Sequence, residues 1–91
     1  MKVLYILTMK TGVKKVTGYK WIVVDSELLG GQPTIKGTRL SVSHILACLS
    51  EGMTSEDIAT DYPGFPKEAL SEILKFASEQ VDKLGPNDVA A

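Results

Sequence analysis

The sequence predicts a small α+β domain, mainly α, in which short N-terminal strands or a hairpin precede a three-helix bundle. Three observations predict it. Short β-branched and aromatic runs fill the first third of the 91-residue chain, and apolar residues recur at helical spacing in the rest. Between them, residues 30–40 hold three glycines, one proline and the only arginine. Because these residue types constrain the backbone path, we expect an ordered corner between sheet and helices.

Length and composition indicate one globular domain with a modest core. The chain is 44% hydrophobic and 23% charged, which is ordinary for a folded protein. We expect a basic extension of β character at 1–19, a helix-turn-helix-like domain at 20–86 and a frayed tail at 87–91. The single cysteine, Cys48, lies in an apolar stretch and is expected to be a buried thiol in a reducing, cytoplasmic setting.

The N-terminal residues predict two short strands. Val3–Met9 favours a first strand, and a turn at Thr11-Gly12 leads into a polar hairpin arm over Val13–Tyr19. The apolar run after Lys2 is too short for a signal peptide or a membrane span, so no membrane association is expected. Alternatively, residues 1–8 are an irregular extension and Met9 is the true start.

The next strands flank the corner. Trp21–Val24 is β-branched and aromatic, and Asp25 closes it. Ser26–Leu29 predicts a short turn, which includes at most one helical turn. Pro33–Ile35 predicts a short extended segment that pairs with the preceding strand, followed by a tight turn at Gly37.

Two short helices follow the corner. Ser41 is a suitable N-cap for a helix from Val42 to about Glu51, which Gly52 ends in a left-handed conformation. Thr54, with an acid three residues later, matches a capping box and predicts a second helix. The sequence Tyr62-Pro63-Gly64-Phe65 breaks this second helix.

A third, longer helix is predicted from Pro66 to about Leu84. Its expected buried stripe is Leu70, Ile73, Leu74, Ala77, Val81 and Leu84. The three helices have the spacing of a helix-turn-helix. However, the exposed face of the third helix carries four acids, including Glu68 and Glu72, which we expect to form ordinary surface pairs. That face is therefore poorly suited to reading DNA.

Charge is distributed unevenly along the chain. Residues 1–24 carry five lysines and no acid, a net charge of +5, whereas the rest carries five bases and eleven acids, a net charge of −6. A polyanionic partner should therefore contact the first third of the chain, because each phosphate contact needs a nearby lysine or arginine.

Part of the sequence resembles a known family. Residues 30–39 form a G-G-x-P-x-I-x-G-T-R corner, residues 51–58 match x-G-M-[ST]-x-E-x-I, and Tyr62-Pro63 follows. Over residues 22–84 this pattern resembles the bacterial and archaeal family called domain of unknown function 433. The resemblance implies a small helix-turn-helix domain, often a dimer, regarded as the antitoxin of a PIN-like ribonuclease toxin. Residues 1–19 lie outside it.

Two functions remain open at this point: a DNA-associated antitoxin or regulator, and a protein-only interaction module or adaptor. For contacts with double-stranded DNA we expect Lys10, Lys14, Lys15, Lys20, Lys36 and Arg39. For contacts with a toxin or a second copy in a homodimer we expect Trp21, Val23 and Phe76. Arg39 has a structural alternative, in which its guanidinium bonds backbone carbonyls or Asp25.

Catalysis, cofactors and metals find no support in the sequence. The only histidine, His44, has no second ligand at metal-binding spacing. Glu56 and Asp57 are adjacent on a helix and point in different directions, and Gly30-Gly31 lacks the Gly-Lys-Ser of a phosphate-binding loop. We therefore expect no enzyme, no metal, no cofactor and no small-molecule substrate.

Overall fold

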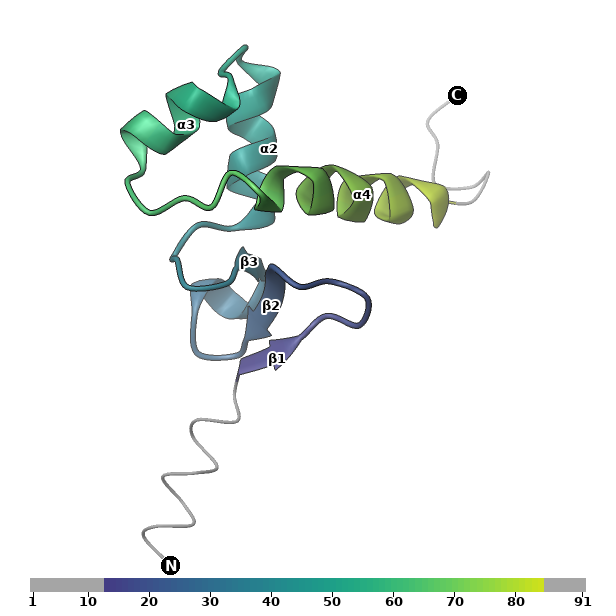
Figure 1. The fold of residues 1–91 in the computed structure, drawn as a ribbon. Coiled ribbons are helices and arrows are strands. Elements are labelled where there is room, and N and C mark those ends of the chain that lie inside the picture. Colours follow the sequence, from purple (N-terminus) through teal and green to yellow (C-terminus); the bar gives the residue numbers. More distant parts are fainter. Residues whose placement is uncertain (1–12, 85–91) are drawn as a thin grey trace, which may run out of the picture.

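The computed structural model of the protein describes residues 13–84 and contains a small sheet below three helices (Figure 1). Its elements are β1 (Val13–Lys15), β2 (Ile22–Asp25), η1 (Leu29–Gly31), β3 (Pro33–Ile35), α2 (Val42–Ser50), α3 (Ser55–Asp61) and α4 (Ala69–Asp82). The predicted α+β class, mainly helical, is confirmed. The strand predicted at Val3–Met9 lies outside the described residues, as do Lys10 and the tail at 87–91.

The three strands form one antiparallel sheet in the order β1-β2-β3. Its register places Ile22 opposite Ile35 and Lys15 opposite Val23. Ile22 and Ile35 are fully buried in the core, and Tyr19, in the β1–β2 turn, joins them. Strand β1 and the β1–β2 turn therefore pack together with β2 and β3.

The corner between sheet and helices is a chain of tight turns. In η1, Leu29, Gly30 and Gly31 have φ values of +52°, +65° and +81°, a left-handed path that glycine adopts without steric cost and that costs the leucine about 1 kcal/mol. After β3, the Thr38 hydroxyl donates to the Ile35 carbonyl and accepts from the Leu40 N–H. These bonds fix the direction in which α2 leaves the sheet.

The helix ends follow the predicted local signals. The Ser41 hydroxyl accepts the His44 N–H at 3.0 Å, and Gly52 has φ +92° after α2. Thr54 and Asp57 form a complete capping box at the start of α3. Helix α4 begins at Ala69, three residues later than predicted, because Pro66–Glu68 form a turn whose first carbonyl accepts the Ala69 N–H.

One isoleucine from each main element meets in the core. The fully buried set is Ile22 of β2, Ile35 of β3, Ile45 of α2, Ile58 of α3 and Ile73 of α4. Cys48 is buried among them, as predicted. Burial of each of the five isoleucine side chains contributes roughly 1.5–3 kcal/mol, so this isoleucine layer holds the sheet to the helices.

The predicted buried stripe of α4 is wrong in its outer half. Leu74, Val81 and Leu84 are 50%, 66% and 55% exposed, whereas Ala69 and Ile73 are fully buried. The physical reason is that α4 extends sideways beyond the body of the domain (Figure 1), so that its C-terminal turns find no covering element among residues 13–84. No helix of this described region is long and apolar enough to cross a membrane.

Candidate binding surfaces

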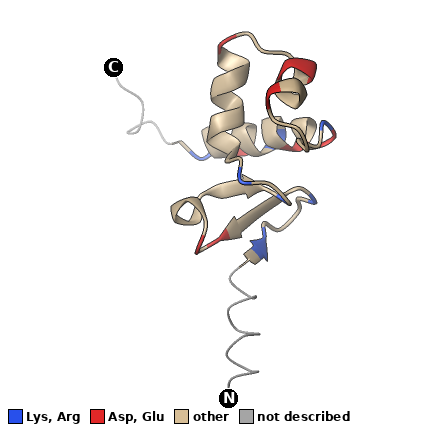
Figure 2. Cartoon of the chain, turned by 90° about the vertical axis from the view of Figure 1, so that its left-hand side faces the viewer, with Lys and Arg blue, Asp and Glu red and all other residues tan. Residues whose placement is uncertain are grey.

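Charge is segregated in space between the two halves of the fold. Residues 13–41, which form the sheet and the corner, carry five basic and two acidic residues, a net charge of +3. Residues 42–84, which form the helices, carry three basic and eight acidic residues, a net charge of −5. Figure 2 shows the acidic segments gathered on α3 and at the outer end of α2. The sheet and corner therefore attract an anionic partner, and the helical half attracts a cationic one.

The candidate lysines of the hairpin do not share one face. Lys14 lies opposite Val24 and Lys15 opposite Val23, and adjacent residues of a strand point to opposite faces. Lys20, in the β1–β2 turn, holds its ammonium 5.5 Å from the centre of the Trp21 ring. Because Lys14 and Lys15 point to opposite faces of the sheet, a polyanion bound to one face can contact only one of these two side chains.

Lys36 and Arg39 lie together at the corner, and both are exposed. The structural alternative for Arg39 is not observed, because no hydrogen bond or ion pair of its guanidinium forms within residues 13–84. In this part of the chain the one ion pair joins Lys67 to Glu56 at 3.7 Å. The guanidinium is therefore available to a partner.

Arg39 borders a cleft of about 360 Å³, which we term the signature cleft. One wall is Gly37–Leu40 and the other is Asp61–Gly64, so two distant parts of the quoted motifs meet here. The Tyr62 hydroxyl lies 2.7 Å from Nε2 of His44, and the two rings meet edge to face. This contact fixes the second wall of the cleft against α2.

An acidic face lies beside the signature cleft on and around α3, where every member is exposed: Glu51, Glu56, Asp57, Asp61 and Glu68. The pKa of Glu56 is lowered, chiefly by the Ser55 hydroxyl, next by its own backbone N–H, and then by Lys67. Asp61 belongs to both the acidic face and the cleft. The acidic face therefore extends to the edge of the cleft.

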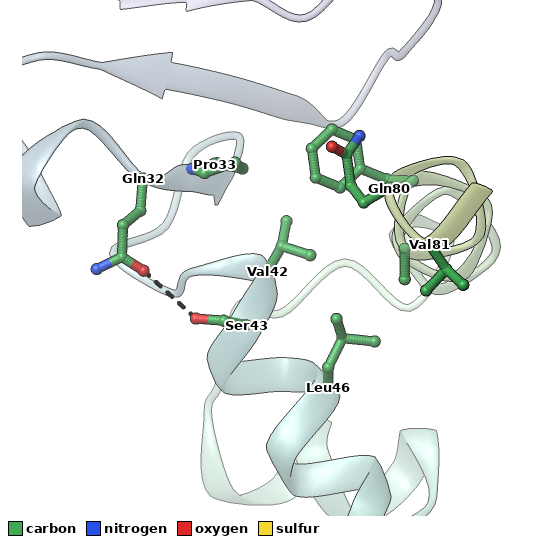
Figure 3. A pocket seen from close by; sticks show the side chains of 9 residues that line it. Gln32, Pro33, Val42, Ser43, Leu46, Gln80 and Val81 are labelled. Carbon is green, nitrogen blue, oxygen red and sulfur yellow. Dashed lines mark hydrogen bonds between the residues drawn. The ribbon is translucent and has the colours of Figure 1, made fainter. Parts of the chain in front are cut away.

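An apolar groove of about 300 Å³ lies on another side, between α2 and α4. Figure 3 shows Val42 and Leu46 of α2 facing the α4 residue Val81 across it, with Phe76 also in the lining. At its rim the Ser43 hydroxyl donates to the Gln32 side-chain oxygen at 3.3 Å. The groove opens onto the exposed apolar end of α4.

The residues predicted to bind a partner occupy different environments. Val23 is only 6% exposed, and Trp21 is partly buried against the core. Phe76 lines the apolar groove and packs edge to face on Tyr19, with ring centres 5.5 Å apart. Of the three, Phe76 is the residue that lines the apolar groove.

Sequence reasoning missed the polar contacts that attach α4 to the hairpin. Glu72, expected to form a surface pair, accepts the backbone N–H groups of Trp21 and Lys20 at 2.7 and 2.9 Å. The Tyr19 hydroxyl donates to Glu79, and burial together with that bond raises the pKa of Tyr19 to about 12. Because these partners are at least 51 residues apart in sequence, no spacing pattern reveals them.

Residues that hold metals do not gather in the described part of the chain. No group of three or more His, Cys, Asp or Glu side chains there is placed to bind a metal ion. The Sγ atom of Cys48 lies 3.9 Å from Nε2 of His44, which makes a pair and not a coordination shell.

Comparisons with known proteins identify relatives of this chain. The family model described as "Protein of unknown function (DUF433)" matches residues 22–77. A crystal structure of a DUF433 member protein from Anabaena variabilis ATCC 29413 is similar with a TM-score of 0.54 and 24% identity. The match covers 90% of this chain and 75% of that one, and at this identity it shows the shared fold alone. No curated protein matches this chain.

Proposed function

This chain belongs to the DUF433 family of proteins of unknown function, and we propose that it is an antitoxin-type binding module for a PIN-like ribonuclease. The observation that carries the proposal is the segregation of charge, with a net charge of −5 on the helical half. A ribonuclease must attract the phosphates of RNA with a basic surface. An acidic face that occupies such a surface competes directly with the substrate.

The acidic face supplies this complementarity in a rigid frame. Three of its five acids, Glu56, Asp57 and Asp61, lie on α3, which the Thr54 capping box fixes at one end and the Tyr62–His44 contact fixes at the other. The signature cleft beside Asp61 adds a concave anchor for a side chain of the ribonuclease. Like its RNA-cleaving target, an antitoxin of this kind acts in the cytoplasm, and it needs no catalytic group of its own.

The proposal is tested with the PIN-like ribonuclease encoded in the neighbouring reading frame. Calorimetry at two salt concentrations compares the wild-type chain with the triple variant Glu51→Gln, Asp61→Asn and Glu68→Gln, whose side chains make no hydrogen bond within residues 13–84. We expect about tenfold or greater loss of affinity, about 1.4 kcal/mol or more, with a weaker salt dependence.

The matched control removes charge from the opposite half. Lys14→Gln with Lys15→Gln changes two exposed lysines on β1 and should leave ribonuclease binding unchanged. Equal affinity of the triple variant and wild type, or absence of a neighbouring ribonuclease that binds, contradicts the proposal.

A second candidate, association with double-stranded DNA, is favoured by the net charge of +3 on the sheet and corner. In this version Lys36, Arg39 and one of the two β1 lysines, Lys14 or Lys15, contact phosphates, because those two lysines point to opposite faces of the sheet. The acids of α4 disfavour its use as a recognition helix. A gel shift with the DNA upstream of the gene, at two salt concentrations, tests it. Salt-sensitive binding supports this second function, and no binding removes it.

A further inference from the structure

Helix α4 carries two apolar stripes, and the core accounts for one of them. Ala69 and Ile73 belong to the core cluster, and Phe76 and Leu70 pack against it, Leu70 being where the two stripes meet at the start of the helix. A second stripe follows a repeat of four, three, four and three residues, as in a coiled-coil seam: Leu70, Leu74, Ala77, Val81 and Leu84. A helix that packs on the core of its own domain needs one apolar stripe, so the core does not explain the second stripe.

The second stripe is largely uncovered in the described structure. Leu74, Val81 and Leu84 are 50%, 66% and 55% exposed. Ala77 and Val81 also line the apolar groove, whose opposite wall is Leu46 of α2. The stripe and the groove are therefore one continuous apolar surface, with room of about 300 Å³ beside the helix. A surface of this kind on a soluble domain marks an interaction site.

We propose that α4 of a second copy of this chain packs antiparallel on this stripe, with the twofold axis at Ala77. The stripe is self-complementary about that residue. Leu70 and Leu84 lie seven residues to either side, so each meets the other across the axis, while Leu74 meets the partner's Val81. A small alanine at the crossing lets the two helix axes approach to about 8 Å.

The residues that flank the stripe favour a second copy over a charged partner. The flanking positions are occupied by Ser71, Ile73, Ser78 and Gln80, none of which is charged. Glu72 and Glu79 lie on the opposite side of the helix, where they bond to the β1–β2 turn, and Lys75, Asp82 and Lys83 lie beyond the flanking positions. An identical seam therefore meets no like charge, although the helical half as a whole is acidic.

This pairing deepens the proposed function without depending on it. The stripe does not overlap the acidic face on α3, so a dimer displays two acidic faces and two signature clefts. Self-association is a property of the purified chain alone. Its failure would therefore leave ribonuclease binding untouched, and failure of ribonuclease binding would leave the dimer untouched.

Sedimentation of the purified full chain tests the pairing. We expect wild type to be dimeric at about 100 µM, and Leu74→Glu with Val81→Glu to weaken the dimer by at least about tenfold. Thr60→Glu, which adds one negative charge to an exposed position of α3, is the control and should remain dimeric. A monomeric wild type, or a dimer insensitive to the double variant, overturns the proposal.

Disulfide cross-linking tests the antiparallel arrangement. Under mild oxidation Ala77→Cys should form a covalent dimer, because only the axis brings one position beside itself in antiparallel helices. Leu84→Cys alone should not link, but should link when mixed with Leu70→Cys. Wild type, with its buried Cys48, gives the background. Self-linking of Leu84→Cys as readily as Ala77→Cys indicates parallel helices and overturns the proposal.

Discussion

Replacing Glu72 with alanine should detach the β1–β2 turn from α4. The carboxylate of Glu72 accepts the Trp21 N–H at 2.7 Å and the Lys20 N–H at 2.9 Å. The first bond is partly buried and the second is exposed. Together with the Tyr19–Glu79 contact, they are the side-chain hydrogen bonds between the hairpin and the helix in residues 13–84, where the Lys75 ammonium also lies 5.3 Å from the centre of the Tyr19 ring.

The size of the effect follows from these two environments. A hydrogen bond to a charged group contributes about 1.5–3 kcal/mol when buried, and an exposed one contributes less, about 0.5–1 kcal/mol. Because the Trp21 bond is only partly buried, Glu72→Ala should lower the free energy of unfolding by about 2–3 kcal/mol, the lower part of the summed range. For a domain of this size, the melting temperature should fall by about 10–20 °C.

Urea unfolding followed by the fluorescence of Trp21, the only tryptophan, measures this loss at the site of the change. Glu68→Ala is the matched control, because it also removes a carboxylate near the start of α4 but makes no hydrogen bond within residues 13–84. We expect the control to lose no more than about 0.5–1 kcal/mol. Equal stability of the two variants would refute the role assigned to Glu72.

Three further predictions concern other parts of the molecule. Because the pKa of Tyr19 is raised to about 12 in the fold, the contribution of Tyr19 to stability should be constant below pH 10 and be lost as pH rises from 10 to 12, and Tyr19→Phe should remove this slope in alkaline unfolding experiments. Thr54→Ala breaks the capping box and should cost about 1 kcal/mol in urea unfolding, whereas a cost near zero would mean that packing alone holds α3. Lys14→Ala with Lys15→Ala should weaken any salt-sensitive DNA binding in a gel shift and leave the melting temperature unchanged, since both side chains are exposed; a large drop in melting temperature would mean that they are structural.

The sequence was a good guide wherever a local signal determines the structure. Pro33–Ile35 is the strand that was predicted, and Trp21–Val24 is shifted by one residue. Ser41 and Thr54 cap their helices as expected, because a cap depends on residues at most three positions away. The DUF433 motifs likewise lie in the region that the family comparison matches.

Where structure depends on distant contacts, the sequence was a poorer guide. Both apolar stripes of α4 have helical spacing, so periodicity alone could not tell that Ile73 is buried and that Val81 is exposed. In the sequence Glu72 is indistinguishable from the other surface acids, and its role appears only when the hairpin folds back on it and Trp21 donates its N–H to the carboxylate. The signature cleft likewise becomes visible only when Arg39 and Asp61 are brought to the same opening.

The central claim, that the acidic face binds a basic ribonuclease, is tested most directly by mapping amide chemical shifts during titration with the neighbouring PIN-like ribonuclease. We predict that the shifts concentrate on residues 51–68 and on the Gly37–Leu40 wall of the signature cleft, and that they fade as salt is added. Shifts confined to β1 and β2, with α3 unperturbed, would contradict the claim.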